Sequence, residues 1–328
     1  MNGREHIIWS ERWRLAALQP GELARIGLMS AVFGLAYVIF HLQGNTTDIN
    51  AYGRSALMWM VERWRDSGPA LGGADYSHGA FIPAVSAYLI WRKRKVLASA
   101  PKAVSAVGLG VVVAALLLHW LGARAQQVRL SLMGLIALMW GIPFYVYGWQ
   151  VAKHLMFPAA YLIFCIPLNF LDSISVPLRL LMTAMTTFLL NGIGIPVERT
   201  GTAIGFISGT FDFDVADPCS GLRSLLAMTA ITAAYAYITQ RTLLKKWILF
   251  LSSIPIAIIG NMFRIMTIAL IAQVFSAELA MKMYHDFSGY LIFLCGTMLM
   301  ISFGAFLNLN YREVWRKWKR DLLLSPTS

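Results

Sequence analysis

Long apolar stretches alternate with short polar segments along most of the chain. Eight of them approach the roughly 20 residues that a helix needs to cross a hydrocarbon core of about 30 Å. The shortest, at 79–91, ends in "YLIW" before "RKRK", which indicates anchoring at a membrane interface. The pattern predicts an all-α polytopic membrane protein with about eight transmembrane helices, near residues 23–42, 79–91, 104–122, 130–148, 155–171, 222–240, 247–274 and 288–308.

The polar segment between the fifth and sixth predicted spans contains two smaller elements. Pro177 starts and Asn191 stops a helix of roughly 14 residues, which is too short to span comfortably and suggests a re-entrant or interfacial helix. The stretch "IPVERTGTAIGFISGTFDFDVA" then alternates polar and apolar residues around "RTG" and "SGT". This alternation predicts a small β-hairpin ahead of the helix at 222–240.

Composition and charge support a membrane protein and set its orientation. Hydrophobic residues make up 58% of the chain and charged residues 13%. The formal net charge of +12 would suit a nucleic-acid partner, but the basic residues follow the predicted topology instead of forming one patch. With both termini in the cytoplasm, the inner segments hold 18 of the 28 lysines and arginines, as the positive-inside rule requires: Arg4, Arg12, Arg14, Arg25, Arg92, Lys93, Arg94, Lys95, Lys102, Lys153, Arg241, Lys245, Lys246, Arg312, Arg316, Lys317, Lys319 and Arg320.

This orientation divides the chain into three parts. We predict a cytoplasmic or interfacial segment at 1–22, a transmembrane domain at 23–308, and a basic cytoplasmic tail at 309–328. Membrane lipids are therefore expected partners, and nucleic acid is not.

The stretch "FDVADPCSGLRSLLAM" places a thiol at the start of the helix predicted at 222–240. Asp217 is a favoured N-cap residue and a proline follows it, so Cys219 falls in the first helical turn. The helix dipole and Arg223, four residues on, both favour the reactive thiolate, although the Asp217 carboxylate opposes them. The structural alternative is a small residue at a crowded helix start.

Two further polar positions fall on the same side of the predicted membrane as Cys219. Asn261 and Arg264 interrupt the apolar span at 247–274 and share one helical face, with Arg264 in the outer half. A charge within a span is costly and suggests function, the alternative being a structural ion pair. His285, with Asp286 beside it, lies just outside the last span. A cysteine, an arginine and a histidine from three segments thus meet at the outer leaflet, as a thiolate nucleophile with a proton shuttle and an oxyanion donor would require.

Other chemistries find little support in the sequence. The motif "HExxH" is absent and the six histidines are scattered, so we expect no metal site. No "GxxxxGK[ST]" or "GxSxG" occurs, and no cofactor is predicted. Cys165 and Cys295 have apolar mid-span surroundings, which favour packing over reactivity.

Five motifs occur in one order: "DYSHG", "SVPLRLLMTAMTTFLLNGIGIPVERTGTAI", "CSGLRSLLAM", "NMFRI" and "HDFSGYLIF". In this combination, residues 70–308 resemble the exosortase/archaeosortase family of membrane-embedded sorting enzymes. The resemblance implies cleavage of secreted proteins that end in a PEP-CTERM-type signal, which is a short motif, a transmembrane helix and a basic tail. It also implies transfer of the new C-terminus to an unknown envelope acceptor, with Cys219 as nucleophile and Arg264 and His285 as its catalytic partners.

The resemblance also suggests a location and leaves some roles open. It implies a bacterial cytoplasmic membrane protein with its active site on the extracytoplasmic side. Where the family commonly has a small residue before the cysteine, this chain has Pro218. The spacing does not decide whether Arg223 or Arg264 stabilises the oxyanion. We predict supporting or substrate-binding roles for Arg223, Ser220, Gly221, Asn261, Asp286, Tyr76, Ser77, His78 and Arg179.

Two other functions remain open from the sequence. A plain intramembrane cysteine endopeptidase would use the same residues but release its product to water instead of transferring it. A non-catalytic factor for assembly or transport of envelope polysaccharide would use Arg264 and His285 to line a path for an anionic headgroup, and it would tolerate Cys219→Ala.

Overall fold

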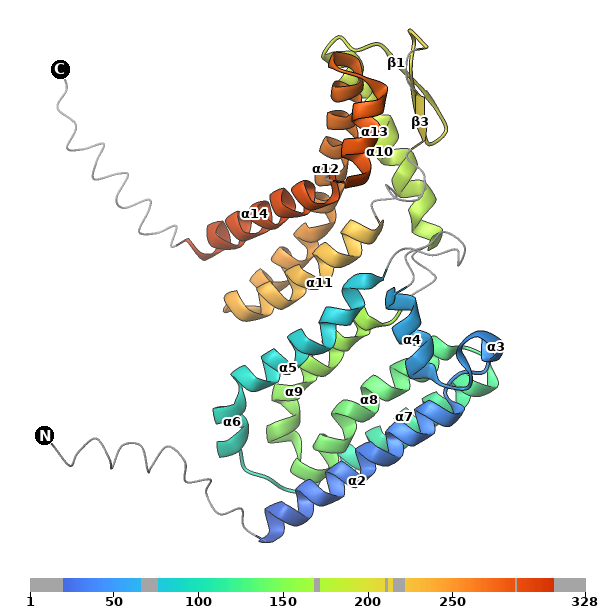
Figure 1. The fold of residues 1–328 in the computed structure, drawn as a ribbon. Helices are drawn as coiled ribbons and strands as arrows, with labels where there is room; N and C mark the ends of the chain where they lie inside the picture. The colour runs from blue at the N-terminus through green and yellow to red at the C-terminus, as the bar shows by residue number, and fades with distance from the viewer. Residues whose placement is uncertain are drawn as a thin grey trace, which may run out of the picture. The chain divides into compact units, whose positions relative to one another are not determined.

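A computed structural model describes residues 20–65, 76–167, 172–209, 212–214, 222–286 and 288–309, most of which are helical (Figure 1). The contacts between Cα atoms divide the chain into two compact units. Unit 1 holds the residues up to Glu62 together with Pro83–Ile166, and unit 2 holds Arg63–Ile82 and the residues from Pro167 onward.

Unit 1 is built around the helices α7 (Ala106–Arg124) and α8 (Val128–Tyr147). Glycines let these two backbones approach closely, because a Cβ on Gly108 would lie 2.4 Å from the Tyr145 nitrogen and one on Gly134 would lie 2.8 Å from the Ala115 oxygen. The remaining elements of this unit are α2 (Pro20–Gln43), α3 (Ile49–Tyr52), α4 (Ala56–Arg65, which ends in unit 2), α5 (Ile82–Arg92), α6 (Arg94–Ser99), α9 (Trp149–Tyr161) and the 3-10 turn η3 (Leu162–Cys165).

A glycine makes the sharp turn between α8 and α9. Gly148 has φ +79°, a left-handed conformation that other residues rarely adopt, and a Cβ there would lie 2.5 Å from the carbonyl oxygen of Ala103. The Ala103 amide in turn donates a hydrogen bond of 3.2 Å to the Tyr147 carbonyl. The segment before α7 therefore packs directly against the start of α9.

Unit 2 combines helices with a small sheet. Its elements are the 3-10 turn η2 (Ser77–Phe81), α10 (Asp172–Gly192), β1 (Val197–Thr200), β2 (Ala203–Phe206), β3 (Asp212–Asp214), α11 (Leu222–Thr239), α12 (Leu243–Val274), α13 (Ala277–Asp286) and α14 (Ser288–Asn308). The strands are antiparallel in the order β1-β2-β3, with Val197 opposite Phe206 and Ile204 opposite Phe213. Gly201, with φ +64°, forms the tight turn between β1 and β2.

The structure supports a multi-pass membrane protein but does not confirm eight spans. Within the described residues, four helices have the length and apolar composition to cross a membrane: Leu23–Gln43, Ala106–Arg124, Val128–Tyr147 and Leu243–Val274. Two shorter apolar helical segments, Leu225–Thr239 and Phe293–Asn308, coincide with predicted spans. The predicted spans at 79–91 and 155–171 correspond to α5 and α9, which have 11 and 13 residues.

Two predicted elements differ from the observed ones. α10 has 21 residues and begins at Asp172, so Pro177 lies inside the helix instead of starting it. A proline near the N-terminal end removes a single helical hydrogen bond, which allows the helix to begin before it. The predicted hairpin is the β1-β2 pair of a three-stranded sheet, because β3 adds a further antiparallel strand.

Candidate active site

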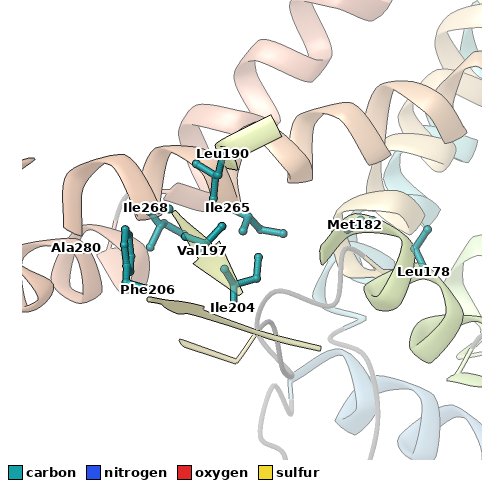
Figure 2. Close-up of a cluster of buried hydrophobic side chains, with 10 residues drawn as sticks. Leu178, Met182, Leu190, Val197, Ile204, Phe206, Ile265, Ile268 and Ala280 are labelled. Carbon is teal, nitrogen blue, oxygen red and sulfur yellow. The ribbon is translucent and has the colours of Figure 1, made fainter. Parts of the chain in front are cut away.

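A buried apolar cluster joins most elements of unit 2 that carry the candidate residues. One face of the sheet contributes Val197, Ile204 and Phe206 to this cluster. α12 packs against it through Ile265 and Ile268, as Figure 2 shows. Ala280 of α13 and Leu190 of α10 complete the contact. The sheet therefore holds α10, α12 and α13 together around the C-terminal half of α12.

α12 carries the predicted Asn261 and Arg264 on one face. The Asn261 side chain is 2% exposed, and its Nδ2 donates to the sulfur of Met182 on α10 at 2.9 Å. Arg264 lies one turn further along α12 and is partly buried. The helix rises about 27 Å from Lys246 to Arg264, close to the thickness of a hydrocarbon core of about 30 Å. Lys246 and Arg264 could therefore lie near opposite interfaces of a bilayer.

The start of α11 lies level with these two residues of α12. α11 and α12 form an antiparallel hairpin in which the Ser253 hydroxyl donates to the Thr229 hydroxyl at 3.3 Å. Leu222, the first residue of α11, lies seven residues before Thr229, and Gly260 lies seven residues after Ser253. Because the two helices are antiparallel, Leu222 is level with Gly260. Cys219, Ser220 and Gly221 directly precede α11 and lie outside the described residues, as does the side chain of Arg223.

α13 returns along the C-terminal end of α12. Ala280 packs into the same cluster as Ile265 and Ala269, after a turn at Phe275 and Ser276. The five residues from Ala280 to His285 rise about 7.5 Å, which brings the backbone of His285 toward the level of Arg264. The backbones of His285 and Asp286 belong to α13, while their side chains lie outside the described ones.

The other predicted residues fall on α10 and η2. Arg179 is partly buried on α10, and its carbonyl accepts a hydrogen bond of 3.0 Å from the Thr183 hydroxyl. Since Met182 is one turn beyond Arg179 and contacts Asn261, α10 brings Arg179 toward the α12 pair. Tyr76 is buried and its ring lies 5.9 Å from that of His78, with Ser77 between them in sequence.

Two buried threonines on α10 were not singled out by the sequence. Thr183 and Thr186 are both fully buried and lie on the same helical face as Arg179 and Met182. The sequence signal that could have identified them is the spacing within "RLLMTAMTT". Its polar residues recur every three to four positions and therefore share the helical face that packs against α12. Arg179, Thr183 and Thr186 thus form a row of polar residues that extends the candidate site along α10.

The described residues contain no group of three His, Cys, Asp or Glu side chains that could hold a metal ion. The predicted absence of a metal and of a cofactor stays an expectation for the whole chain.

A comparison with models of known protein families identifies the family of this chain. Residues 64–302 match the family model described as transmembrane exosortase. The chain belongs to the transmembrane exosortase family. This confirms the resemblance inferred from the five motifs, and the match includes every predicted site residue from Tyr76 to Asp286. Most of α2–α4 precedes the matched exosortase region. No curated protein and no solved structure gave a significant match.

Proposed function

We propose that this exosortase-family protein is a membrane-embedded cysteine transpeptidase. Its substrates would be secreted proteins with a C-terminal PEP-CTERM-type signal: a short motif, a transmembrane helix and a basic tail. It would act at the extracytoplasmic side of a bacterial inner membrane, with both termini in the cytoplasm. The observation that carries this proposal is the family match over residues 64–302.

The proposed reaction begins with a proton transfer. His285 takes the proton of the Cys219 thiol, and the thiolate attacks a substrate carbonyl near the sorting motif. Arg264 stabilises the negative oxygen that develops there. The peptide C–N bond then breaks as His285 returns the proton to the leaving amine, leaving a thioester on Cys219. An envelope nucleophile attacks the thioester, releases the thiol and forms the new bond.

The packing of unit 2 is compatible with this mechanism. The partly buried guanidinium of Arg264 on α12 meets less competition from water than an exposed one would, so its charge would act more strongly on a developing oxyanion. α11 begins, and α13 ends, level with this part of α12. Asn261, anchored by Met182, would keep α12 in register with α10, and Arg179 would contribute a second positive charge.

The decisive experiment follows a tagged PEP-CTERM protein in cells that carry Cys219→Ala, Cys219→Ser or the unchanged chain. The proposal predicts that both variants leave the substrate at its unprocessed mass. Full processing by Cys219→Ala would overturn the enzymatic proposal in favour of a non-catalytic envelope factor. The buried Cys165 provides a control, since Cys165→Ser should leave processing intact if the protein folds.

The mass of the product's new C-terminus then distinguishes transfer from hydrolysis. A C-terminus carrying an added amine or hydroxyl compound supports a transpeptidase. A free carboxylate would instead identify a plain endopeptidase. Arg223→Gln and Arg264→Gln, compared in the same assay, separate the two candidates for the oxyanion donor, because loss of the donor should slow formation of both the thioester and the product.

A further inference from the structure

A basic rim lies at one end of unit 1, and none of the predicted site residues belongs to it. Residues 76–171 contain eight lysines and arginines and no aspartate or glutamate. Six of the eight lie in two predicted inner segments: Arg92, Lys93, Arg94, Lys95, Lys102 and Lys153.

The fold gathers three of these lysines from separate segments. The buried Ser86 hydroxyl donates to the Pro158 carbonyl at 2.8 Å, which fixes α5 against α9 (Figure 1). Lys93 lies about two turns after Ser86 and directly follows the end of α5. Lys153 and His154 lie slightly more than one turn before Pro158 on α9. Lys93 and Lys153 each lie near enough to lower the pKa of His154, after the larger effect of its partial desolvation.

Lys102 reaches the same end of unit 1 by another route. Its ammonium lies 5.7 Å from the centre of the Tyr147 ring, and the next residue, Ala103, bonds to the Tyr147 carbonyl. Tyr147 is the last residue of α8, and Trp149 begins α9. Lys102 therefore lies beside the first turn of α9, and Lys153 begins the next turn.

The described acidic side chains of unit 1 belong to its other end. Asp48 accepts a hydrogen bond of 2.7 Å from Trp59, and Trp59 in turn lies under the guanidinium of Arg129. Arg129 is in the first turn of α8, about 27 Å along the helix from Tyr147. Glu62 follows Trp59 on α4. At a Debye length of about 8 Å, these acids screen the basic rim only weakly. The side chain of Glu22, in the first turn of α2, lies outside the described ones.

Exposed aromatic side chains flank this basic rim. Trp91 and Trp149 are 57% and 52% exposed, and Tyr88 is exposed one turn before Trp91. Tryptophan and tyrosine with such exposure in a membrane protein favour the headgroup level of the bilayer. The exposed apolar residues Ile90 and Met156 lie beside them, where acyl chains could pack.

We propose that Lys93, Lys102 and Lys153 bind the phosphodiester headgroup of an anionic phospholipid. The lysines supply point charges and donors for the phosphate oxygens, and the aromatic and apolar neighbours hold the glycerol and acyl chains. This site is separate from the proposed peptidase chemistry, so either proposal can fail without the other.

The test uses the purified full chain in detergent and native mass spectrometry with phosphatidylglycerol and phosphatidylcholine of identical acyl chains. The unchanged chain should retain phosphatidylglycerol preferentially. Lys93→Gln/Lys153→Gln should reduce that preference about twenty-five-fold, since each lysine near an anionic surface contributes about a fivefold effect. Lys93→Arg/Lys153→Arg keeps the charge and should keep most of the preference, which separates loss of the site from misfolding.

A charge-matched control removes two arginines elsewhere. Arg124→Gln/Arg199→Gln lowers the net charge equally. Arg124 is exposed at the end of α7, close in sequence to the start of α8, and Arg199 is exposed on β1 of unit 2. Retention of the preference in this control supports the proposal. An equal loss in the control would overturn it in favour of a diffuse effect of net charge. Equal retention of the two lipids by the unchanged chain, or displacement of phosphatidylglycerol by millimolar inorganic phosphate alone, would also overturn it.

Discussion

Ile204 offers the sharpest test of how the sheet supports the candidate site. Its side chain is 0% exposed at the centre of β2, in the cluster that joins the sheet to α12 and α13. Ile207, three residues further on, is 68% exposed. The same substitution to alanine at the two positions removes the same three carbon atoms from very different surroundings.

The expected magnitudes follow from burial. At about 0.8 kcal/mol for each buried CH₂ group, Ile204→Ala loses about 2.4 kcal/mol of transfer free energy. The cavity that remains between the sheet and α12 adds to this loss, so the total should fall between about 2 and 5 kcal/mol. Ile207→Ala should cost less than about 1 kcal/mol, because most of its side chain is already exposed.

The effect should be local before it is global. We expect faster hydrogen exchange of the β1 and β2 amides in Ile204→Ala than in Ile207→Ala, together with a lower midpoint of unfolding in detergent. Substrate processing should fall with the exchange protection, because β3 leads into the segment that holds Cys219. Equal exchange rates and equal midpoints for the two variants would refute the role assigned to this cluster.

Three further predictions concern other parts of the chain. Gly148→Ala should destabilise unit 1 by about 1–3 kcal/mol in detergent unfolding, because of its positive φ and the clash with Ala103. Gly110→Ala should leave the unfolding midpoint unchanged, because no atom lies within 4 Å of the added Cβ. Equal midpoints for the two variants would contradict this. Arg264→Gln should slow substrate cleavage by about 10²–10³-fold in a quantitative processing assay with the unfolding midpoint retained, and an unchanged rate would remove it from the mechanism. The pKa of His154 is lowered first by desolvation and then by Lys93 and Lys153, so the folded chain favours the neutral ring and becomes less stable as pH falls below the ordinary value of 6.5. Lys93→Gln should raise this pKa in an NMR titration. An unshifted titration would show that Lys93 is not close.

Some residues of the candidate site could be recognised in the sequence, and others only in the fold. Arg264 and Asn261 stood out in the sequence because a polar side chain within an apolar span is costly, and the structure places both on one face of α12 beside α10. Met182, Thr183 and Thr186 did not stand out, because a methionine or threonine is common on any helix. Only the packing of α10 against α12 gives them a position. The roles of Cys219 and His285 stay predictions, since the first lies outside the described residues and the side chain of the second does as well.

The sequence by itself determined that the chain is a membrane protein of the exosortase family. Apolar length and the distribution of basic residues are local properties that depend on transfer into a bilayer, and the ordered motifs identify the family without any coordinates. The tertiary structure decided how the sheet joins α10, α12 and α13, and which residues of α10 lie against α12. These features depend on packing between residues far apart in the chain, such as the cluster that includes both Ile204 and Ile265, and no local pattern specifies such packing. The grouping of Lys93, Lys102 and Lys153 at one rim has the same origin, because three separate segments must pack before their charges lie together.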